Sequence, residues 1–193
     1  AWLGLPLVKT HGIEALFWAH GIYLAIIGFL LFLLIAPDKP EQQADDRLSF
    51  ETILTRHIQS YSSAYIAAPA LGWFFYTLSY VATLTVLPLY LDVEDRAFVQ
   101  IAAPLAGIIS SMTVGLLLIR SFGAVSTIVL GFVLSVIAAF TVWLVPQAAW
   151  PTLFLLASLG FVQGATFAAI PALNASQEHR TLANGATAQM GNL

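Results

Sequence analysis

One stretch of the chain decides the fold. Residues 121–177 read SFGAVSTIVLGFVLSVIAAFTVWLVPQAAWPTLFLLASLGFVQGATFAAIPALNASQ, and these 57 positions contain no Asp, Glu, Lys, Arg or His. The interior of a 193-residue soluble domain cannot accommodate such a run. A helix rises about 1.5 Å per residue and a lipid core is about 30 Å thick, so this length suits two crossings. Pro146, Gln147, Trp150 and Pro151 mark the predicted turn between them.

The composition of the whole chain agrees with this interpretation. Charged residues make up 9% and apolar residues 59%, whereas an ordinary soluble domain has about 25% charged residues. We therefore expect a multi-pass integral membrane protein whose main partner is the lipid bilayer, in a bacterial inner (plasma) membrane. The net charge is −3 and the seven Lys and Arg do not cluster, which argues against nucleic-acid binding.

The charge-free segments predict a series of all-α membrane spans. We expect complete helices over residues 15–36, 64–89, 97–119, 122–145 and 152–173, and a further helix that begins near Thr181. The connections near residues 37–59, at Arg120 and at Arg180 hold five cations, and the opposite side holds Lys9 and Arg96. Because cytoplasmic loops carry the excess of Lys and Arg, the first group is predicted to be cytoplasmic.

The long connection predicts a helix of its own. Ser49 is a candidate N-cap, and apolar positions recur at helical spacing in Phe50, Ile53, Leu54 and Ile58. Such an amphipathic helix is expected to lie along the membrane surface. Two roles stay open for it: a structural connector, or a binding site for a cytosolic partner.

Small residues recur at every fourth position on two of the spans. They are Ala103, Gly107, Ser111 and Gly115 on one, and Gly160, Gly164, Ala168 and Ala172 on the other. Small residues let membrane helices approach closely, since lipid provides no hydrophobic drive to pack them. Gly107, Ser111, Gly160 and Gly164 are therefore predicted packing residues, in an interface that is either static or able to slide.

The predicted spans 15–36, 64–89, 97–119, 122–145 and 152–173 contain no Asp, Glu, Lys or Arg, and the chain has no cysteine. A carboxylate pair for acid–base chemistry, a nucleophilic triad at membrane depth and a thiolate metal site are all missing from them. We therefore expect neither an enzyme nor a bound cofactor or metal. His20 is the single histidine within a span, and we interpret it as an interfacial or packing residue, with a proton role as the alternative.

Neutral polar side chains supply the candidate substrate cavity. Trp73, Tyr76 and Tyr80 share one helical face with Thr77 and Thr83. Polar groups also stand within two other predicted helices, and the full set of candidate cavity residues is Trp73, Tyr76, Tyr80, Gln163, Thr166 and Gln189. These groups need partners in hydrocarbon, which are a solute, water or another helix.

Several motifs resemble those of a known family. LPLYL (87–91) looks like the outer end of the seventh helix of a major facilitator superfamily transporter. GLLLIRSFG (115–123) is similar to its cytoplasmic turn between the eighth and ninth helices, with Gly115, Arg120 and Gly123 keeping the pattern and Ile119 where an Asp is frequent. GFVQGATFAAIPAL (160–173) and LANGATAQMGNL (182–193) resemble the tenth and eleventh helices.

The resemblance implies part of a twelve-helix transporter, a polytopic transmembrane helical bundle. Residues 1–36 are then the end of the N-terminal half, residues 37–59 the cytoplasmic loop between the halves, and residues 60–193 the C-terminal half up to the start of its eleventh helix. The family implies secondary active transport of a small-molecule substrate by alternating access, with proton-coupled efflux as one option. The alternative function is a non-transporting membrane sensor or scaffold on the same fold.

Overall fold

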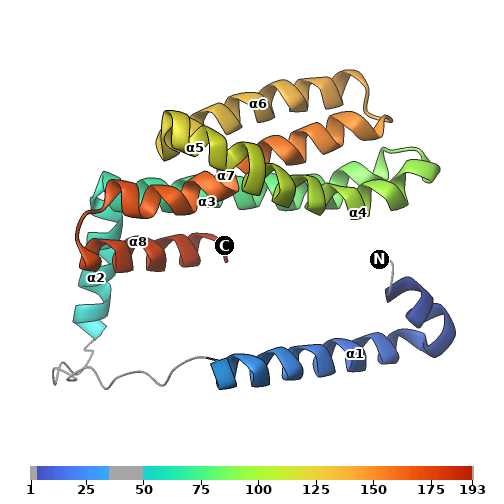
Figure 1. Ribbon diagram of the computed structural model, residues 1–193, viewed down its shortest axis with the longest axis horizontal. Coiled ribbons are helices and arrows are strands. Elements are labelled where there is room, and N and C mark those ends of the chain that lie inside the picture. The colour runs from blue at the N-terminus through green and yellow to red at the C-terminus, as the bar shows by residue number, and fades with distance from the viewer. Residues whose placement is uncertain (1–3, 35–49, 193) are drawn as a thin grey trace. The chain divides into compact units, whose positions relative to one another are not determined.

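The computed structural model describes residues 4–34 and 50–192, and every regular element in them is a helix. The elements are α1 (Gly4–Leu34), α2 (Phe50–Ser62), α3 (Ala64–Val86) with a 3₁₀ turn η1 (Leu87–Leu89), α4 (Val93–Ser110), a π-helical turn η2 (Ser111–Gly115), α5 (Leu116–Phe122), α6 (Ala124–Leu144), α7 (Ala149–Leu173) and α8 (Gln177–Met190) (Figure 1). The predicted all-α fold is thereby confirmed.

Five of these helical segments are long and apolar enough to cross a membrane. They are Leu7–Leu34, Ala64–Leu89, Val93–Phe122, Ala124–Leu144 and Ala149–Leu173. The chain divides into two units, Ala1–Ser49 and Phe50–Leu193. In the first unit α1 is interrupted at Gly12, whose φ of 80° lies in the left-handed region that glycine adopts without strain. The predicted boundary at residues 36–37 and the proposed Ser49 cap lie outside the described residues.

Two predicted helix boundaries are wrong by about one turn. Trp150 and Pro151 belong to the first turn of α7 and not to the preceding turn, because a proline lacks only an N–H group that has no partner at this position. The last helix begins at Gln177, earlier than Thr181, because the Ser176 hydroxyl accepts a hydrogen bond from the His179 N–H at 3.2 Å. This is a side-chain N-cap.

The helix predicted over residues 97–119 is interrupted. Between α4 and α5 the π-helical turn η2 inserts an extra residue into the hydrogen-bond ladder, and the Ser111 N–H is shared between the carbonyls of Gly107 and Ile108. The Ser110 hydroxyl donates to the Gly107 carbonyl at 3.0 Å and to the Ala157 carbonyl of α7 at 2.6 Å. The interruption therefore lies where the helix packs against α7, and π-type insertions of this kind are a known cause of local helix bending.

Helix α7 is the centre of the second unit. In its span 56% of the residues are buried, against 17–22% in the spans of α3, α4 with α5, and α6. It contacts α3, α4 and α6, and Figure 1 shows it lying between α6 and α3. Helix α8 packs along α3, and the short helix α2 contacts α3 and α8 at one end of the unit. The amphipathic helix predicted in the long connection is thus a helix that packs on the spans.

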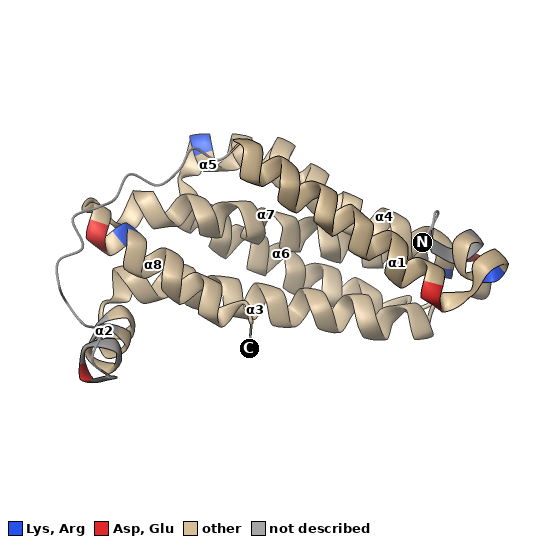
Figure 2. Ribbon diagram, turned by 90° about the horizontal axis from the view of Figure 1, so that it is seen from below, with Lys and Arg blue, Asp and Glu red and all other residues tan. Residues whose placement is uncertain are grey.

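Charged side chains of the second unit lie at the two ends of its helices (Figure 2). Arg120 is in the last turn of α5, and Glu178 and Arg180 are in the first turn of α8. At the opposite end, Asp92, Glu94, Asp95 and Arg96 stand at the start of α4, where the Arg96 guanidinium donates to the carbonyls of Leu91 at 3.0 Å and Leu89 at 3.2 Å. Helix ends with opposite charge character therefore face opposite sides of the membrane.

This arrangement yields a test of topology. We expect Glu178 on the cytoplasmic side and Asp95 outside, because the cation-rich connections share the end that holds Glu178. With no native cysteine in the 193 residues, Asp95→Cys should react with an impermeant maleimide in intact cells, and Glu178→Cys should react only after the membrane is opened. The reverse pattern would invert the topology. Asp45, predicted on the cytoplasmic side as well, lies outside the described residues.

Candidate functional site

Three of the predicted cavity residues form an aromatic column on α3. The ring centroids of Trp73 and Tyr76 are 5.0 Å apart, and those of Tyr76 and Tyr80 are 5.3 Å apart. Phe167 of α7 extends the column, with its centroid 4.7 Å from that of Trp73. Tyr76 is only 5% exposed, and the Tyr80 ring lies against Gly107 of α4. The column therefore faces α4 and α7 inside the unit.

The other predicted cavity residues lie elsewhere. Thr166 is fully buried between α7 and α3, where its hydroxyl donates to the Val162 carbonyl at 2.7 Å. Gln163 is half-buried on α7. Gln189 on α8 accepts a hydrogen bond from the Tyr61 hydroxyl of α2 at 3.1 Å, next to a small polar pocket of about 230 Å³. The structure thus does not bring all six into one cluster, and their role in a cavity stays a prediction.

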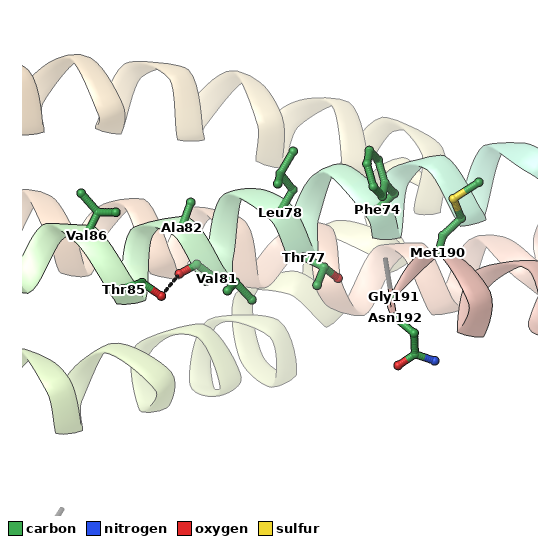
Figure 3. Close-up of a pocket in the computed structure, with 10 residues that line it drawn as sticks. All are labelled: Phe74, Thr77, Leu78, Val81, Ala82, Thr85, Val86, Met190, Gly191 and Asn192. Atoms are coloured by element: carbon green, nitrogen blue, oxygen red, sulfur yellow. Dashed lines mark hydrogen bonds between the residues drawn. The ribbon is translucent and has the colours of Figure 1, made fainter.

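A larger groove runs along a different face of α3. It has a volume of about 570 Å³, and Figure 3 shows the second half of α3 along one side and the C-terminal end of α8 at the other. Its lining residues are Phe74, Thr77, Leu78, Val81, Ala82, Thr85, Val86, Met190, Gly191 and Asn192. None of them is charged, and the size falls within the range of small-molecule pockets.

The groove and the aromatic column meet at Trp73. A side chain at Gly191, which lines the groove, would collide with the Trp73 indole. Glycine at this position lets the end of α8 lie directly against α3, so that the column stands behind the groove wall. This second wall of α3 was missed by the sequence analysis, because a 3.6-residue period shows which residues share a face and not which face meets a neighbour.

The four predicted packing residues come together between α4, η2 and α7. A Cβ added at Gly160 would collide with the Gly107 carbonyl and the Ser110 hydroxyl, and one added at Gly164 would collide with the Ser111 hydroxyl. The backbones of α4 and α7 are therefore in direct contact. Ser110, which bridges the two helices, was not identified from the sequence.

A similar interface on the other side of α7 was also missed. The residues of α6 buried at a spacing of three or four are Ala124, Thr127, Gly131, Ser135, Ala138 and Val142. A Cβ at Gly131 would lie 2.7 Å from the Val162 side chain and 3.2 Å from its backbone nitrogen. The four-residue spacing of Thr127, Gly131 and Ser135 carried this signal in the sequence.

The predicted cytoplasmic turn is divided between two places. Gly123 forms the turn itself, between α5 and α6, with a φ of 82° that favours glycine. Arg120 is exposed in the last turn of α5, where a cation complements the helix dipole. Gly115 is buried in η2, where a Cβ would lie 3.1 Å from the Ser110 carbonyl and 3.6 Å from the Phe161 ring. Gly115 is thus placed in the α7 interface.

Asn174 locks the turn between α7 and α8. Its side chain is 2% exposed, and its amide nitrogen donates to the carbonyls of Tyr65 at 3.1 Å and Ile170 at 3.0 Å. The Arg180 guanidinium donates to the Asn174 carbonyl at 2.8 Å. The residue joins the end of α7 to the start of α3, a structural role that no spacing rule in the sequence indicated.

These features define a polytopic helical membrane protein. The family model of the Major Facilitator Superfamily matches residues 1–193. Searches of curated proteins and of solved structures find no match to the chain. The chain belongs to the major facilitator superfamily, and the protein is therefore a membrane transporter of that superfamily with several membrane-spanning helices.

Proposed function

We propose that the protein moves a small uncharged solute across the membrane by alternating access, along a path that includes the α3–α8 groove. The observation that carries this proposal is the groove itself, which has the volume of a small-molecule site and no charged lining residue. An ionic solute would leave its charge unpaired against this wall, which is costly at membrane depth. The predicted cavity residues of the aromatic column stand behind the same wall.

The tight helix interfaces support a rocking motion of the whole unit. Alternating access in secondary transporters is largely rigid-body movement of one bundle against another. The contact between the backbones of Gly160 and Gly107 and the hydrogen bond from Ser110 to Ala157 hold α4 and α7 together. Sliding within the unit would break both. We therefore favour static packing inside the unit, with the motion at its outer faces.

The direction and coupling that we propose are proton-driven efflux across a bacterial inner membrane. The test uses bacterial cells that express the complete protein and 1-N-phenylnaphthylamine, an uncharged aromatic probe that fluoresces in membranes. Expressing cells should accumulate less probe than control cells, and a protonophore should abolish the difference. A difference that survives the protonophore would contradict the coupling.

A variant with a blocked groove makes this test specific. Leu78 is 57% exposed in the groove wall, so Leu78→Trp should fill the groove and remove the efflux without unfolding the protein. Val136→Trp is the matched control, because Val136 is 71% exposed on α6, outside the groove. If no uncharged probe distinguishes expressing cells from control cells, the non-transporting sensor or scaffold becomes the better assignment.

A further inference from the structure

The hydroxyl of Thr77 is unusual among those of the helical threonines. Thr83 and Thr85 on the same helix donate to the carbonyls four residues earlier, at 2.7 Å and 2.8 Å. This is the ordinary way in which a threonine satisfies its hydroxyl within a helix. The Thr77 hydroxyl is buried and has no hydrogen-bond partner among the described residues.

An unpaired hydroxyl is unfavourable in an apolar environment. Nearly all buried polar side-chain atoms in proteins have a hydrogen-bond partner, so each exception requires an explanation. Thr77 lines the groove together with apolar side chains, among them Leu78 and Val81 (Figure 3). A bound solute in the groove would supply the missing partner.

We propose that the groove binds an uncharged, mostly apolar solute that accepts one hydrogen bond from the Thr77 hydroxyl. This inference rests on the proposed function and names the class of its substrate: a ketone, amide, ester or ether on an apolar or aromatic frame. The apolar lining provides the contact area, and the single free donor fixes the orientation of the solute. Thr85 also lines the groove, but its hydroxyl is already bound to the Val81 carbonyl.

The two methionines of the chain make the site measurable. Met190 lines the groove, whereas Met112 is 66% exposed on η2, away from it. Benzophenone is uncharged, has one acceptor oxygen, and on irradiation inserts readily into methionine C–H bonds. The complete protein in lipid nanodiscs is irradiated over a range of benzophenone concentrations, and the adducts at both methionines are quantified by peptide mass spectrometry. Labelling of Met190 should saturate, and labelling of Met112 should rise linearly.

Two matched substitutions test the hydroxyl itself. Thr77→Val keeps the shape and should weaken saturable labelling of Met190 by about threefold to tenfold, the effect of one neutral hydrogen bond. Thr85→Val should leave it unchanged, and Thr77→Ser should restore most of it. The melting temperature of Thr77→Val should not fall, because valine removes an unpaired buried hydroxyl. A purely structural role for Thr77 would instead lower it.

Two results would overturn the proposal. If Met190 is labelled linearly and no more than Met112, lipid or another segment of the complete protein covers the groove. If Thr77→Val binds benzophenone as the unchanged protein does, the hydroxyl is not the donor. Labelling requires no transport, so intact labelling without probe efflux would reject only the proposed function, and efflux without saturable labelling would reject only this site.

Discussion

Replacing Gly160 by alanine is expected to destabilise the protein by about 3 kcal/mol, at the upper end of the cost of overpacking. The added methyl group would collide with the Gly107 carbonyl and the Ser110 hydroxyl. Because one of these neighbours is backbone, no rotamer change relieves the collision, and α4 must move away from α7. The displacement would also break the hydrogen bond from Ser110 to the Ala157 carbonyl.

The same chemical change at Gly185 is the control. A Cβ at Gly185, on α8, has nothing within 4 Å, so alanine there should keep or slightly raise the stability through its better helix propensity. Thermal unfolding of the purified complete protein, followed by tryptophan fluorescence, compares the two variants. Equal melting temperatures would show that α4 and α7 are not in backbone contact at this point.

Cysteine accessibility is expected to differ at least tenfold between two neighbouring positions of α3. Leu78 is 57% exposed in the groove, whereas Tyr76 is 5% exposed in the aromatic column. If water enters the groove, Leu78→Cys should react rapidly with a small hydrophilic thiol reagent, because the reactive thiolate forms in water. Tyr76→Cys should react slowly, since α4 and α7 enclose it.

The polar-face hypothesis predicts the opposite result, so the experiment decides between the two walls of α3. If Tyr76, Tyr80 and Gln163 line the aqueous path, then cysteines at Tyr80 and Gln163 should react and be protected by solute, and Leu78→Cys should be inert. Val136→Cys on α6 serves as the lipid-facing control. It should stay unreactive although Val136 is 71% exposed in the protein, because lipid excludes the reagent.

The amino-acid sequence by itself determined the membrane architecture. A bilayer imposes one strong rule, that apolar runs of about 20 residues form helices whose backbone groups are satisfied internally. The run between Arg120 and Glu178 was therefore enough to predict two spans, and the structure has α6 and α7 there. The four-residue spacing of Gly160 and Gly164 likewise indicated a close helix contact, because such spacing is a property of a single helix.

What the tertiary structure alone decided is which neighbour each face meets. Tyr76 and Leu78 are two residues apart, and only the positions of α4, α7 and α8 make the first buried and the second part of a groove. The π-helical turn η2 depends on the contact of Ser110 with α7, and the unpaired hydroxyl of Thr77 on its place beside α8. Helical periodicity is local, whereas packing joins residues far apart in the chain. The contacts that shape a binding surface are therefore not written in the period of any one helix.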